Sequence, residues 1–569
     1  MKILFVNPAF PPSLWDFALS RDLEGSRYTH PPLALPTLAA LTPPEHEVRL
    51  VDENVDSVAM DADADVVGIT GYYIQRARVF ELAAAFRARG KRVVIGGPIV
   101  EASTIAEILK HADHVFQGEA EYTWPRFLSD LEQGTTAREY IQRELVDMRD
   151  SPPPRYDLLS QEAYSTATIE TSRGCPMACE FCEIPSRLGK KARSKSLEQV
   201  MAEVRAHHGL GADSIFFIDD HFIGNRAHVK RLLEELVRFQ AETGNAMYFT
   251  CQFTINLARD REMLELLHAA NFRRVFVGIE TPRKASLLSV RKKQNVLGDL
   301  VEAVRTLQSY NITVWAGMIV GFDTDDPAIF DEQREFLSAA GIPVVMSGLL
   351  QAIPGTPLYE RMAREGRLRD TDFGGVRGTY DALLMTNIIP RAFTDEELVR
   401  GYQRMIREIY EYEPYAQRVL DSLRRGDKPI AKPRKSTVSV KKLRIVARTV
   451  RFYLWTGDAR RRRMFFRVVG ETLRHRPEEL ETALMHLVVY KHLRLFYRTV
   501  ASLPVPRMLA TPQVESEPAD GADHHRDAER LPNRGDAADP PRAVGADQLE
   551  SGTNRTVGTG TRSDHGTVR

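Results

Sequence analysis

The sequence predicts an α/β protein with two successive parallel sheets: an N-terminal doubly wound, Rossmann-like sheet and then a partial (β/α)6 barrel. A helical C-terminal extension and a disordered tail follow. Residues 1–125 alternate short β-rich runs with helical stretches, and the alternation resumes with longer helices over 166–358. Such alternation is typical of parallel sheets covered by helices. Residues 359–510 are helical in pattern and locally basic, whereas 511–569 contain almost no large apolar residues, so we expect no packed core there.

The composition limits the classes of partner and compartment. The 569 residues include 77 Lys and Arg and 77 Asp and Glu, so the balanced charge points to no polyanionic partner, and we expect no nucleic-acid binding. Four cysteines, three of them in one loop, argue against a disulfide framework and for a reducing compartment. The N-terminal run ends at Pro8 and does not read as a signal peptide, and no apolar run approaches membrane-spanning length. We therefore expect a cytoplasmic location, with peripheral contact at the inner membrane face as the alternative.

The first region carries polar or turn-forming residues where its β-rich runs end. The runs are Ile3 to Val6, Glu47 to Val51, Val66 to Thr70, Val93 to Gly97 and His114 to Gln117, and Ala77 to Ala88 is a helical stretch between them. The residues at their ends are Asn7, Thr70, Gly71, Gly96, Gly97, Gly118 and Glu119. Any one of these glycines alone is explained by a turn. Together, at the carboxyl ends of one parallel sheet, they predict a ligand-binding crevice.

The second region repeats the alternation after a connector, residues 126–165, with the stiff centre Ser151-Pro-Pro-Pro-Arg155. Its β-rich runs are Ala167 to Thr171, Ser214 to Ile218, Met247 to Gln252, Arg274 to Ile279, Thr313 to Val320 and Val344 to Leu350. Six strand-and-helix units predict a partial barrel. Catalytic groups then belong at the carboxyl ends of its strands.

A cysteine loop, Cys175-Pro-Met-Ala-Cys179-Glu-Phe-Cys182, follows the first strand of this barrel. Three thiolates so close can reach one soft metal centre, but they leave one coordination position open. An open position lets a metal centre bind and activate a substrate. The alternatives are a structural zinc site with Cys251 as a distant fourth ligand, and three cysteines that are close by chance. Cys251 itself lies in an apolar strand, which favours an ordinary buried side chain.

The CxxxCxxC spacing, with Phe181 before the last cysteine, resembles the cysteine motif of the radical S-adenosylmethionine (SAM) enzymes. The resemblance implies that the three cysteines hold a four-iron, four-sulfur (4Fe-4S) cluster, with the amino and carboxylate groups of SAM on the fourth iron. The run from Gly317 to Gly321 resembles the fifth-strand motif of this family, which packs near the adenine of SAM. The family also implies an external electron donor such as flavodoxin or ferredoxin.

Acidic residues stand at two further strand ends of the barrel. Asp219 and Asp220 follow the second strand, and Glu280 closes the fourth. Carboxylates at these positions can accept hydrogen bonds from the ammonium or ribose groups of SAM. The alternatives are capping of the next helix by the two aspartates and an ordinary salt bridge for Glu280. His221 is either catalytic or a solvated loop residue.

Residues 1–125 resemble the cobalamin-binding domains that precede the barrel in many radical SAM enzymes, in which the corrinoid lies across the strand ends. The Asp-x-His-x-x-Gly motif of the better known cobalamin domains is absent, because Asp52-Glu-Asn-Val-Asp56 contains no histidine. We therefore expect cobalt to lack a lower ligand from this motif. The stretches Phe217 to Asn225 and Phe276 to Pro282 resemble the branch that contains the hopanoid carbon-2 methylases.

This second resemblance implies methyl transfer to an unactivated carbon of a lipid or small natural product. A 5′-deoxyadenosyl radical formed from SAM would remove a hydrogen atom, and methylcobalamin would deliver the methyl group. Cyclisation or rearrangement without methyl transfer is the alternative within the family. A cobalamin-binding sensor with a vestigial barrel is the non-enzyme alternative, although the presence of all three cysteines argues against it.

Basic and aromatic residues are interleaved between Lys432 and Arg467, including the run Arg460 to Arg463 and Trp455. This mixture is suited to the surface of an anionic membrane. A helical cap with solvated charges explains the same composition slightly better. Nucleic-acid binding is a weaker third reading, because no known nucleic-acid-binding module accompanies the charge.

Overall fold

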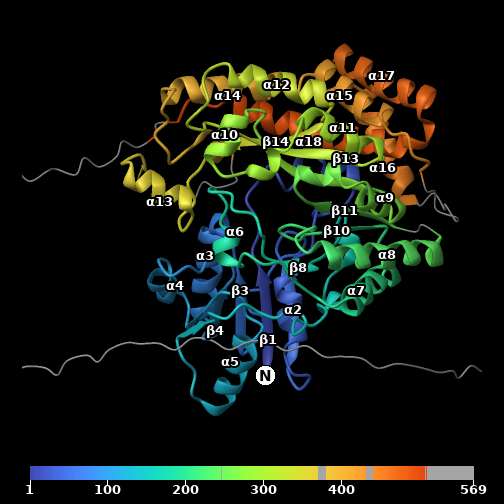
Figure 1. The fold of residues 1–569 in the computed structure, drawn as a ribbon. Helices are drawn as coiled ribbons and strands as arrows, with labels where there is room; N and C mark the ends of the chain where they lie inside the picture. Colours follow the sequence, from blue (N-terminus) through green and yellow to red (C-terminus); the bar gives the residue numbers. More distant parts are fainter. Residues whose placement is uncertain (245–246, 370–379, 431–439, 507, 509–569) are drawn as a thin grey trace, which may run out of the picture. The chain divides into compact units, whose positions relative to one another are not determined.

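The computed structural model describes residues 1–244, 247–369, 380–430, 440–506 and 508 (Figure 1). The predicted disordered tail, 511–569, and the residues of the basic segment up to 439 lie outside this part of the chain. Residues Met1–Pro512 belong to one unit by their mutual contacts. Among the described residues, no helix combines the length and the apolar character that crossing a bilayer requires.

The first sheet has six parallel strands in the order β2-β1-β3-β4-β5-β6. The strands are β1 (Lys2–Asn7), β2 (Glu47–Asp52), β3 (Val66–Thr70), β4 (Arg92–Gly96), β5 (His114–Gln117) and β6 (Glu139–Ile141). This arrangement confirms the predicted Rossmann-like sheet. The edge strand β6 was not predicted and lies within the stretch expected to be a connector. Three residues are too few to show an alternating pattern.

Helices cover both faces of this sheet, as the doubly wound prediction requires. Leu4 and Val6 of β1 belong to a core with α3 (Arg76–Arg87) and α4 (Ile105–His111). Ile3 and Phe5 belong to a separate core with α2 (Ala34–Ala40) and α5 (Thr123–Gln133). Because successive side chains of a strand point to opposite faces, β1 contributes to both cores and is buried on both sides.

The second sheet is also parallel, in the order β14-β13-β12-β11-β10-β7, and confirms the predicted partial barrel. Its strands are β7 (Ala167–Ile169), β10 (Ser214–Phe217), β11 (Tyr248–Gln252), β12 (Phe272–Glu280), β13 (Thr313–Val320) and β14 (Val344–Leu349). The helices between them include α7 (Leu197–Gly209), α8 (Arg226–Thr243), α9 (Arg261–Ala269), α11 (Leu300–Ser309) and α12 (Ile329–Ala340). In β13, Val314 and Ala316 are fully buried, whereas Trp315 and Gly317 on the other face are partly exposed.

Three tyrosines of the C-terminal helices pair with the outer edge of β14. The Tyr410 hydroxyl donates to the carbonyl of Val345 at 2.7 Å and accepts from its amide at 2.9 Å. The Tyr402 hydroxyl donates to the Ser347 carbonyl at 2.7 Å, and that of Tyr497 accepts from the Ser347 amide at 2.9 Å. These contacts occupy backbone groups that an open edge strand would leave unpaired.

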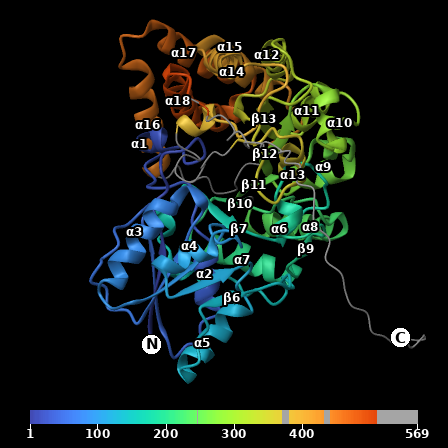
Figure 2. The same ribbon diagram turned by 90° about the vertical axis from the view of Figure 1, so that its left-hand side faces the viewer.

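The later C-terminal helices lie together beside the second sheet (Figure 2). They are α14 (Asp395–Ile409), α15 (Tyr412–Arg424), α16 (Val440–Leu454), α17 (Ala459–His475) and α18 (Leu480–Ser502). α13 (Pro357–Arg364) lies apart from them and contacts the cysteine loop at Glu180. Shorter elements are α1 (Arg21–Glu24), α6 (Ile184–Arg187), α10 (Lys284–Ser289) and the hairpin of β8 (Ser172–Arg173) with β9 (Arg193–Ser194). This hairpin frames the cysteine loop.

Candidate active site

The cysteine loop lies at the carboxyl end of β7, between β8 and α6. Cys179 is buried, and Cys175 and Cys182 are partly exposed. Burial raises the pKa of Cys175, and it raises that of Cys182 to about 12, with the neighbouring thiols adding to both shifts. Thiolates, not thiols, are metal ligands, so these side chains need a positively charged centre to ionise at neutral pH.

The donor set of the loop fits a cluster with one open position better than a structural zinc ion. Structural zinc takes four protein ligands, whereas the loop supplies three cysteines. Cys251, the fourth ligand of the zinc alternative, is fully buried in β11 within the hydrophobic core. The donor set of the loop therefore suits a larger metal centre with one open position.

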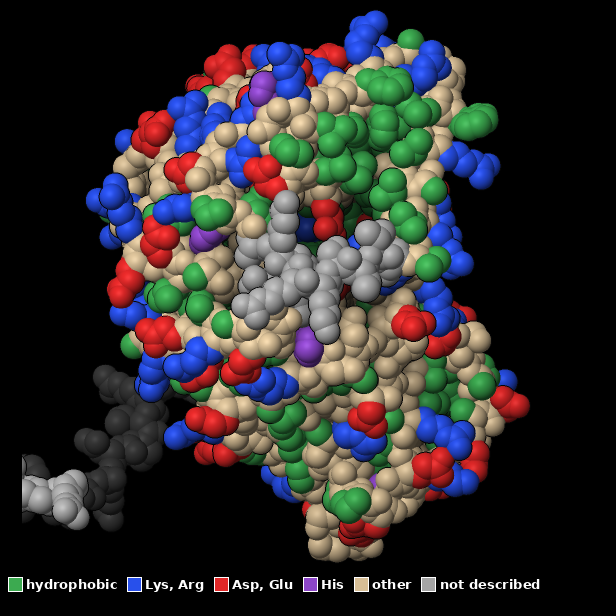
Figure 3. All heavy atoms as spheres, turned by 90° about the vertical axis from the view of Figure 1, so that its right-hand side faces the viewer, with side chains coloured by type: hydrophobic (Ala, Val, Ile, Leu, Met, Phe, Trp, Pro, Cys, Tyr) green, Lys and Arg blue, Asp and Glu red, His purple; other side chains and the backbone are tan. Residues whose placement is uncertain are grey.

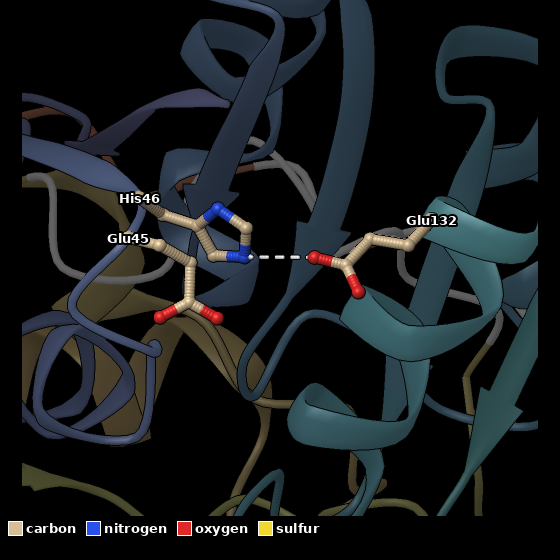
Figure 4. A group of neighbouring side chains, drawn as sticks. All are labelled: Glu45, His46 and Glu132. Atoms are coloured by element: carbon tan, nitrogen blue, oxygen red, sulfur yellow. Dashed lines mark ion pairs between the residues drawn. The ribbon is translucent and has the colours of Figure 1, made fainter.

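A separate group of possible ligand atoms lies in the first region, where Glu45, His46 and Glu132 meet (Figure 4). The His46 ring contacts the Met1 amino group at 3.3 Å through Nδ1 and the Glu132 carboxylate at 3.5 Å through Nε2. An ammonium group is only a donor, so Nδ1 accepts and Nε2 carries the hydrogen that faces Glu132. The group is thus explained as a link between the start of β2 and α5.

A buried ion pair lies beside the cysteine loop. Lys292 pairs with Glu280, stands 5.6 Å from the centre of the Phe181 ring, and is almost fully buried. Burial alone would lower the pKa of Lys292, but the charges of Glu280 and Cys179 keep it above its usual value. Gln294 donates to the Cys179 sulfur at 3.4 Å. The loop therefore has a cation and an amide donor next to its sulfur atoms, which favours an anionic thiolate centre.

Glu280 occupies an unusual backbone position at the end of β12. Its φ is 66°, and the pairing of β12 with β13 is irregular between Gly278 and Glu280. A side chain at Gly278 would collide with the Glu280 carboxylate and the Lys292 amine, 2.4 and 2.8 Å from the site of its first carbon. A left-handed backbone at a residue other than glycine is uncommon and typical of functional sites. The absence of a side chain at Gly278 thus leaves room for the Glu280–Lys292 ion pair.

Arg173 ties the cysteine loop to the end of β5. Its guanidinium lies 2.9 Å from Glu119, 2.7 Å from Glu121 and 2.9 Å from Glu170. Glu119 also pairs with Arg193 at 3.0 Å, and the Val146 amide donates to it at 2.8 Å. Although burial opposes ionisation, these donors hold the pKa of Glu119 below its usual value. The two glutamates belong to the first region, so this bridge joins the two sheets at the loop.

A second bridge holds the opposite side of the cysteine loop. Arg361 of α13 donates to both oxygens of Glu180, at 2.9 and 3.0 Å, and to Asp323 at 2.8 Å. Arg367 also donates to Asp323, at 2.6 Å. Glu180 lies between Cys179 and Phe181. The cysteine loop is thus held at Arg173 and at Glu180 by bidentate or multiple charged hydrogen bonds.

The family of this fold and site emerges from sequence comparison. Residues 169–336 match the Radical SAM superfamily, and residues 356–503 match a domain of unknown function, DUF4070. The hopanoid C-2 methylase of Rhodopseudomonas palustris is 34% identical over 425 residues, which cover 72% of this chain and 80% of that protein. The chain belongs to the radical SAM superfamily. An uncharacterized methyltransferase of Synechocystis is 36% identical over 74% of this chain and 78% of its own length.

Solved radical SAM structures share the fold. The cobalamin-dependent radical SAM enzyme OxsB superposes with a TM-score of 0.56 at 16% identity, over 87% of this chain and 80% of its own. The radical SAM methyltransferase TsrM of Kitasatospora setae superposes with a TM-score of 0.51 at 18% identity, over 65% and 76%. The OxsB match covers most of this chain, so the two proteins share a fold.

Asp219 and Asp220, which were predicted to contact SAM, lie in different surroundings from one another. Asp219 is fully buried and accepts from the amide and hydroxyl of Thr171, both at 2.5 Å, and from the amide of Ser172 at 2.9 Å. Burial raises its pKa to about 7. Asp220 is half-buried and accepts from the Gly174 amide at 2.9 Å. Asp219 therefore fastens the strand end that leads into the loop, and Asp220 keeps one oxygen atom for a further donor. Their predicted contacts with SAM stay predictions.

The two predicted barrel glycines lie on β13 and just beyond it. Gly317 is opposite Gly278 of β12, so neighbouring strands both lack a side chain at this level of the inner face. The site of a first side-chain carbon at Gly317 lies 3.0 Å from the Phe276 ring. Gly321 has a φ of 101°, and its amide donates to Asp325 at 2.9 Å. The glycine pair lets the Glu280–Lys292 ion pair and the Phe276 ring approach the two strands closely. The predicted contacts of Gly317 and Gly321 with SAM stay predictions.

The predicted cobalamin contacts gather at one end of the first sheet. The Gly71 amide donates to the Gly96 carbonyl at 3.2 Å, and a side chain at Gly97 would collide with the Thr70 hydroxyl at 2.6 Å. Asn7 donates to Asp52 at 2.9 Å. The seven predicted positions are Asn7, Thr70, Gly71, Gly96, Gly97, Gly118 and Glu119, and they offer amides, hydroxyls and backbone but no imidazole. This donor set fits a corrinoid that takes no histidine from these strand ends.

Several residues of the site escaped prediction. Arg173 stands inside the motif that contains the cysteines, and its position before Gly174 was available as a signal. Lys292 and Gln294 lie just after α10, and Arg361 lies in α13. None of them belongs to a recognised motif, so only the fold brings them to the cysteine loop. His221 is buried, and burial lowers its pKa to about 4, so of its two alternatives the solvated loop residue is wrong. A catalytic role for His221 stays a prediction.

Proposed function

We propose that the protein is a cobalamin-dependent radical SAM methyltransferase that methylates an unactivated carbon of a lipid. The observation that carries this proposal is the cysteine loop with one open metal position, joined by Arg173 to the strand ends of a Rossmann-like sheet. Arg173 thereby links the two regions to which we assign the cofactors. Two relatives named as a methyltransferase and a methylase support the reaction class, because this chain matches each of them over more than two thirds of its length.

The residues of the chain have separable tasks. In this proposal Cys175, Cys179 and Cys182 hold the 4Fe-4S cluster, and Glu280 and Asp220 accept hydrogen bonds from SAM. The Asp220 carboxylate supports this role because one of its oxygen atoms is not used by the Gly174 amide. When bound, the cluster, SAM and cobalamin supply a carbon radical and a methyl group. Lys292 supplies a buried positive charge beside the cysteine loop and Glu280. The protein aligns the cofactors and protects them, while the difficult chemistry belongs to the cofactors.

The first sheet is suited to hold the corrinoid across the carboxyl ends of β1, β3, β4 and β5. In the position of the missing histidine motif, Asp52 accepts from Asn7 at 2.9 Å and from the Tyr164 hydroxyl at 2.9 Å. Both oxygen atoms of the Asp52 carboxylate are thus bound by other residues of the protein. This supports the proposal that the corrinoid takes no lower cobalt ligand from this segment.

A lipid substrate is proposed because a relative is named for methylation of hopanoids. A lipid would be met at a bilayer, so we also propose peripheral contact with the inner membrane face. An external flavodoxin or ferredoxin is proposed as the electron donor. Cyclisation or rearrangement of the same class of substrate is the competing reaction, and it adds no methyl group to the product.

The test is an anaerobic reaction with SAM that carries a deuterated methyl group, a reductant, cobalamin and a bacterial lipid extract. The proposal predicts a lipid product heavier by one labelled methyl group. The Cys179→Ala protein should give no product, because its cluster is lost. An unlabelled cyclised or rearranged lipid would support the competing reaction. Transfer of label to a water-soluble acceptor other than methionine, with none in lipid, would overturn the lipid assignment, because cleavage of SAM itself releases labelled methionine.

A further inference from the structure

We infer that the outer face of α16 and α17 is a docking surface for an anionic membrane leaflet; the choice of a membrane over a protein partner rests on the lipid substrate proposed above. The surface, here called the α16–α17 face, has six exposed apolar side chains: Val440, Leu443, Val446, Trp455, Phe466 and Leu473. Its exposed basic side chains include Arg444, Arg448, Arg451, Arg463 and Arg474.

The concentration of apolar surface on this face is high. Six of the fourteen exposed large hydrophobic side chains in the described part of the chain lie between 440 and 473. Hydrophobic side chains gather on the upper part of the face drawn in Figure 3, where α16 and α17 lie, with Lys and Arg side chains at the border. A gathered patch of this kind marks an interaction surface, whereas single exposed apolar residues do not.

The pattern along α16 separates apolar and basic stripes. Val440, Leu443 and Ala447 follow the i, i+3, i+7 spacing of one helix face, and all are exposed. Arg444, Arg448 and Arg451 follow the same type of spacing on the adjacent face. The opposite side of the helix is buried through Thr449 and Tyr453. A helix lying in a membrane surface needs this arrangement, in which long arginine side chains reach from the apolar stripe to the headgroups.

The turn after α16 and the next helix extend the surface. Trp455, at the turn, is 86% exposed, and Phe466 and Leu473 of α17 are 59% and 50% exposed with i, i+7 spacing. Tryptophan is favoured at the level of lipid headgroups because its ring is both apolar and able to donate a hydrogen bond. The most exposed aromatic ring of this group thus stands at the end of the basic helix.

The inner side of the face is firmly attached to the protein. The Tyr453 hydroxyl donates to the Leu487 carbonyl at 2.7 Å, and Tyr412 donates to Asp458 at 2.8 Å. Arg461 lies 4.4 Å from the centre of the Phe452 ring, and Arg462 donates to the Thr456 carbonyl. Two arginines of the run at 460–463 therefore serve the fold. The structure assigns the membrane contact mainly to α16, not to this run.

Charge complementarity selects an anionic partner. Residues 440–454 contain five Lys or Arg and no Asp or Glu, although the whole chain has 77 of each class. The basic stripe borders an open depression lined by Arg448, Arg21, Arg27 and Asp22, among others. Arg21 and Arg27 pair there with Asp16 and Asp56, so the charge available to an anionic leaflet is mainly that of α16.

The test measures binding of the full-length protein to phosphatidylcholine vesicles with and without phosphatidylglycerol. Binding should require phosphatidylglycerol and should weaken as salt rises, because the Debye length falls to about 10 Å at 0.1 M. Changing Arg444, Arg448 and Arg451 to Gln should weaken binding about 100-fold, since each arginine near an anionic surface contributes roughly a factor of five. Leu443→Ser with Trp455→Ser should also weaken binding.

The chain offers a matched control for each variant. Arg400, Arg404 and Arg407 of α14 are exposed with the same spacing as the three arginines of α16, so their change to Gln removes equal charge elsewhere. Leu210→Ser and Leu288→Ser remove exposed leucines outside the face. Both controls should bind vesicles like the unchanged protein. Equal loss in the α14 control would show that net charge alone governs binding and would overturn the assignment of the face.

Two outcomes separate this inference from the proposed reaction. Methylation of detergent-dispersed lipid should persist in the α16 variant, because the cysteine loop is unchanged. Vesicle binding without any methylation would contradict the proposed function and leave the docking surface supported. No binding to the anionic vesicles at low salt, or self-association abolished by Leu443→Ser, would overturn the membrane as occupant.

Discussion

Removing the Arg173 side chain should loosen the cysteine loop and the end of β5 together. Arg173→Met keeps a side chain of similar length but leaves Glu119, Glu121 and Glu170 without this cation. The side chains of Arg173, Glu119 and Glu121 are 14%, 7% and 5% exposed. Breaking a buried ion pair by removing one partner costs about 3–5 kcal/mol, since the other charge stays buried without compensation.

The cost should be concentrated near the bridge. Arg193 still pairs with Glu119, so we expect local opening and not global unfolding. Hydrogen exchange measured by mass spectrometry should accelerate about 100- to 4,000-fold for the amides of Val146 and Cys175, because about 1.4 kcal/mol corresponds to a factor of ten. The Val146 amide donates to Glu119, and the Cys175 amide donates to the Gly189 carbonyl.

A surface ion pair supplies the control. Arg155 and Asp157 are 2.7 Å apart, but their side chains are 47% and 60% exposed. Pairs of this kind contribute about 0–1 kcal/mol, so Arg155→Met should change exchange little. If Arg173→Met also leaves the exchange of both amides within a factor of ten, the bridge does not hold the loop and the reasoning fails.

Three further predictions address the ligands, one buried acid and the corrinoid. Changing any one of the loop cysteines to alanine should abolish bound iron and SAM cleavage, and the three variants are Cys175→Ala, Cys179→Ala and Cys182→Ala. The Cys251→Ala control should retain both properties. Loss of iron in the Cys251 variant alone would refute the ligand set. Burial raises the pKa of Asp219 from 3.8 to about 7. The folded protein then holds a proton that the unfolded chain releases, so this group's stabilisation is lost as pH rises from about 4 to 7, and Asp219→Asn should flatten that dependence in urea titrations. An equal slope in both proteins would contradict this. Bound cob(II)alamin should show no histidine nitrogen splitting in electron paramagnetic resonance, and such splitting would mean that a histidine ligates cobalt.

Long buried strands were predictable because their sequence pattern is local. β12 and β13 have nine and eight residues, and their apolar runs stand out from the flanking helices. β6 and the β8–β9 hairpin have two or three residues in each strand. Their pairing depends on neighbours far along the chain, which no local pattern reveals.

The site shows the same limit. Glu119 was expected at the edge of the first sheet, and it lies there, but its oxygen atoms meet Arg173, Arg193 and the Val146 amide. The position of Glu119 at a strand end was thus predictable from the sequence, whereas its ion-pair and hydrogen-bond partners were not. Lys292 pairs with Glu280 from twelve residues further along, after α10 has reversed the chain. Such pairs arise from tertiary packing and carry no spacing rule.

The central claim is that three cysteines hold a 4Fe-4S cluster whose remaining iron is open to SAM. Electron paramagnetic resonance of the anaerobically reduced protein, recorded with and without SAM, tests it most directly. We predict about four irons per chain, a reduced-cluster signal, and a clear change of that signal when SAM is added, because SAM enters the open position. A signal that SAM leaves unchanged, or zinc in place of iron, would contradict the account.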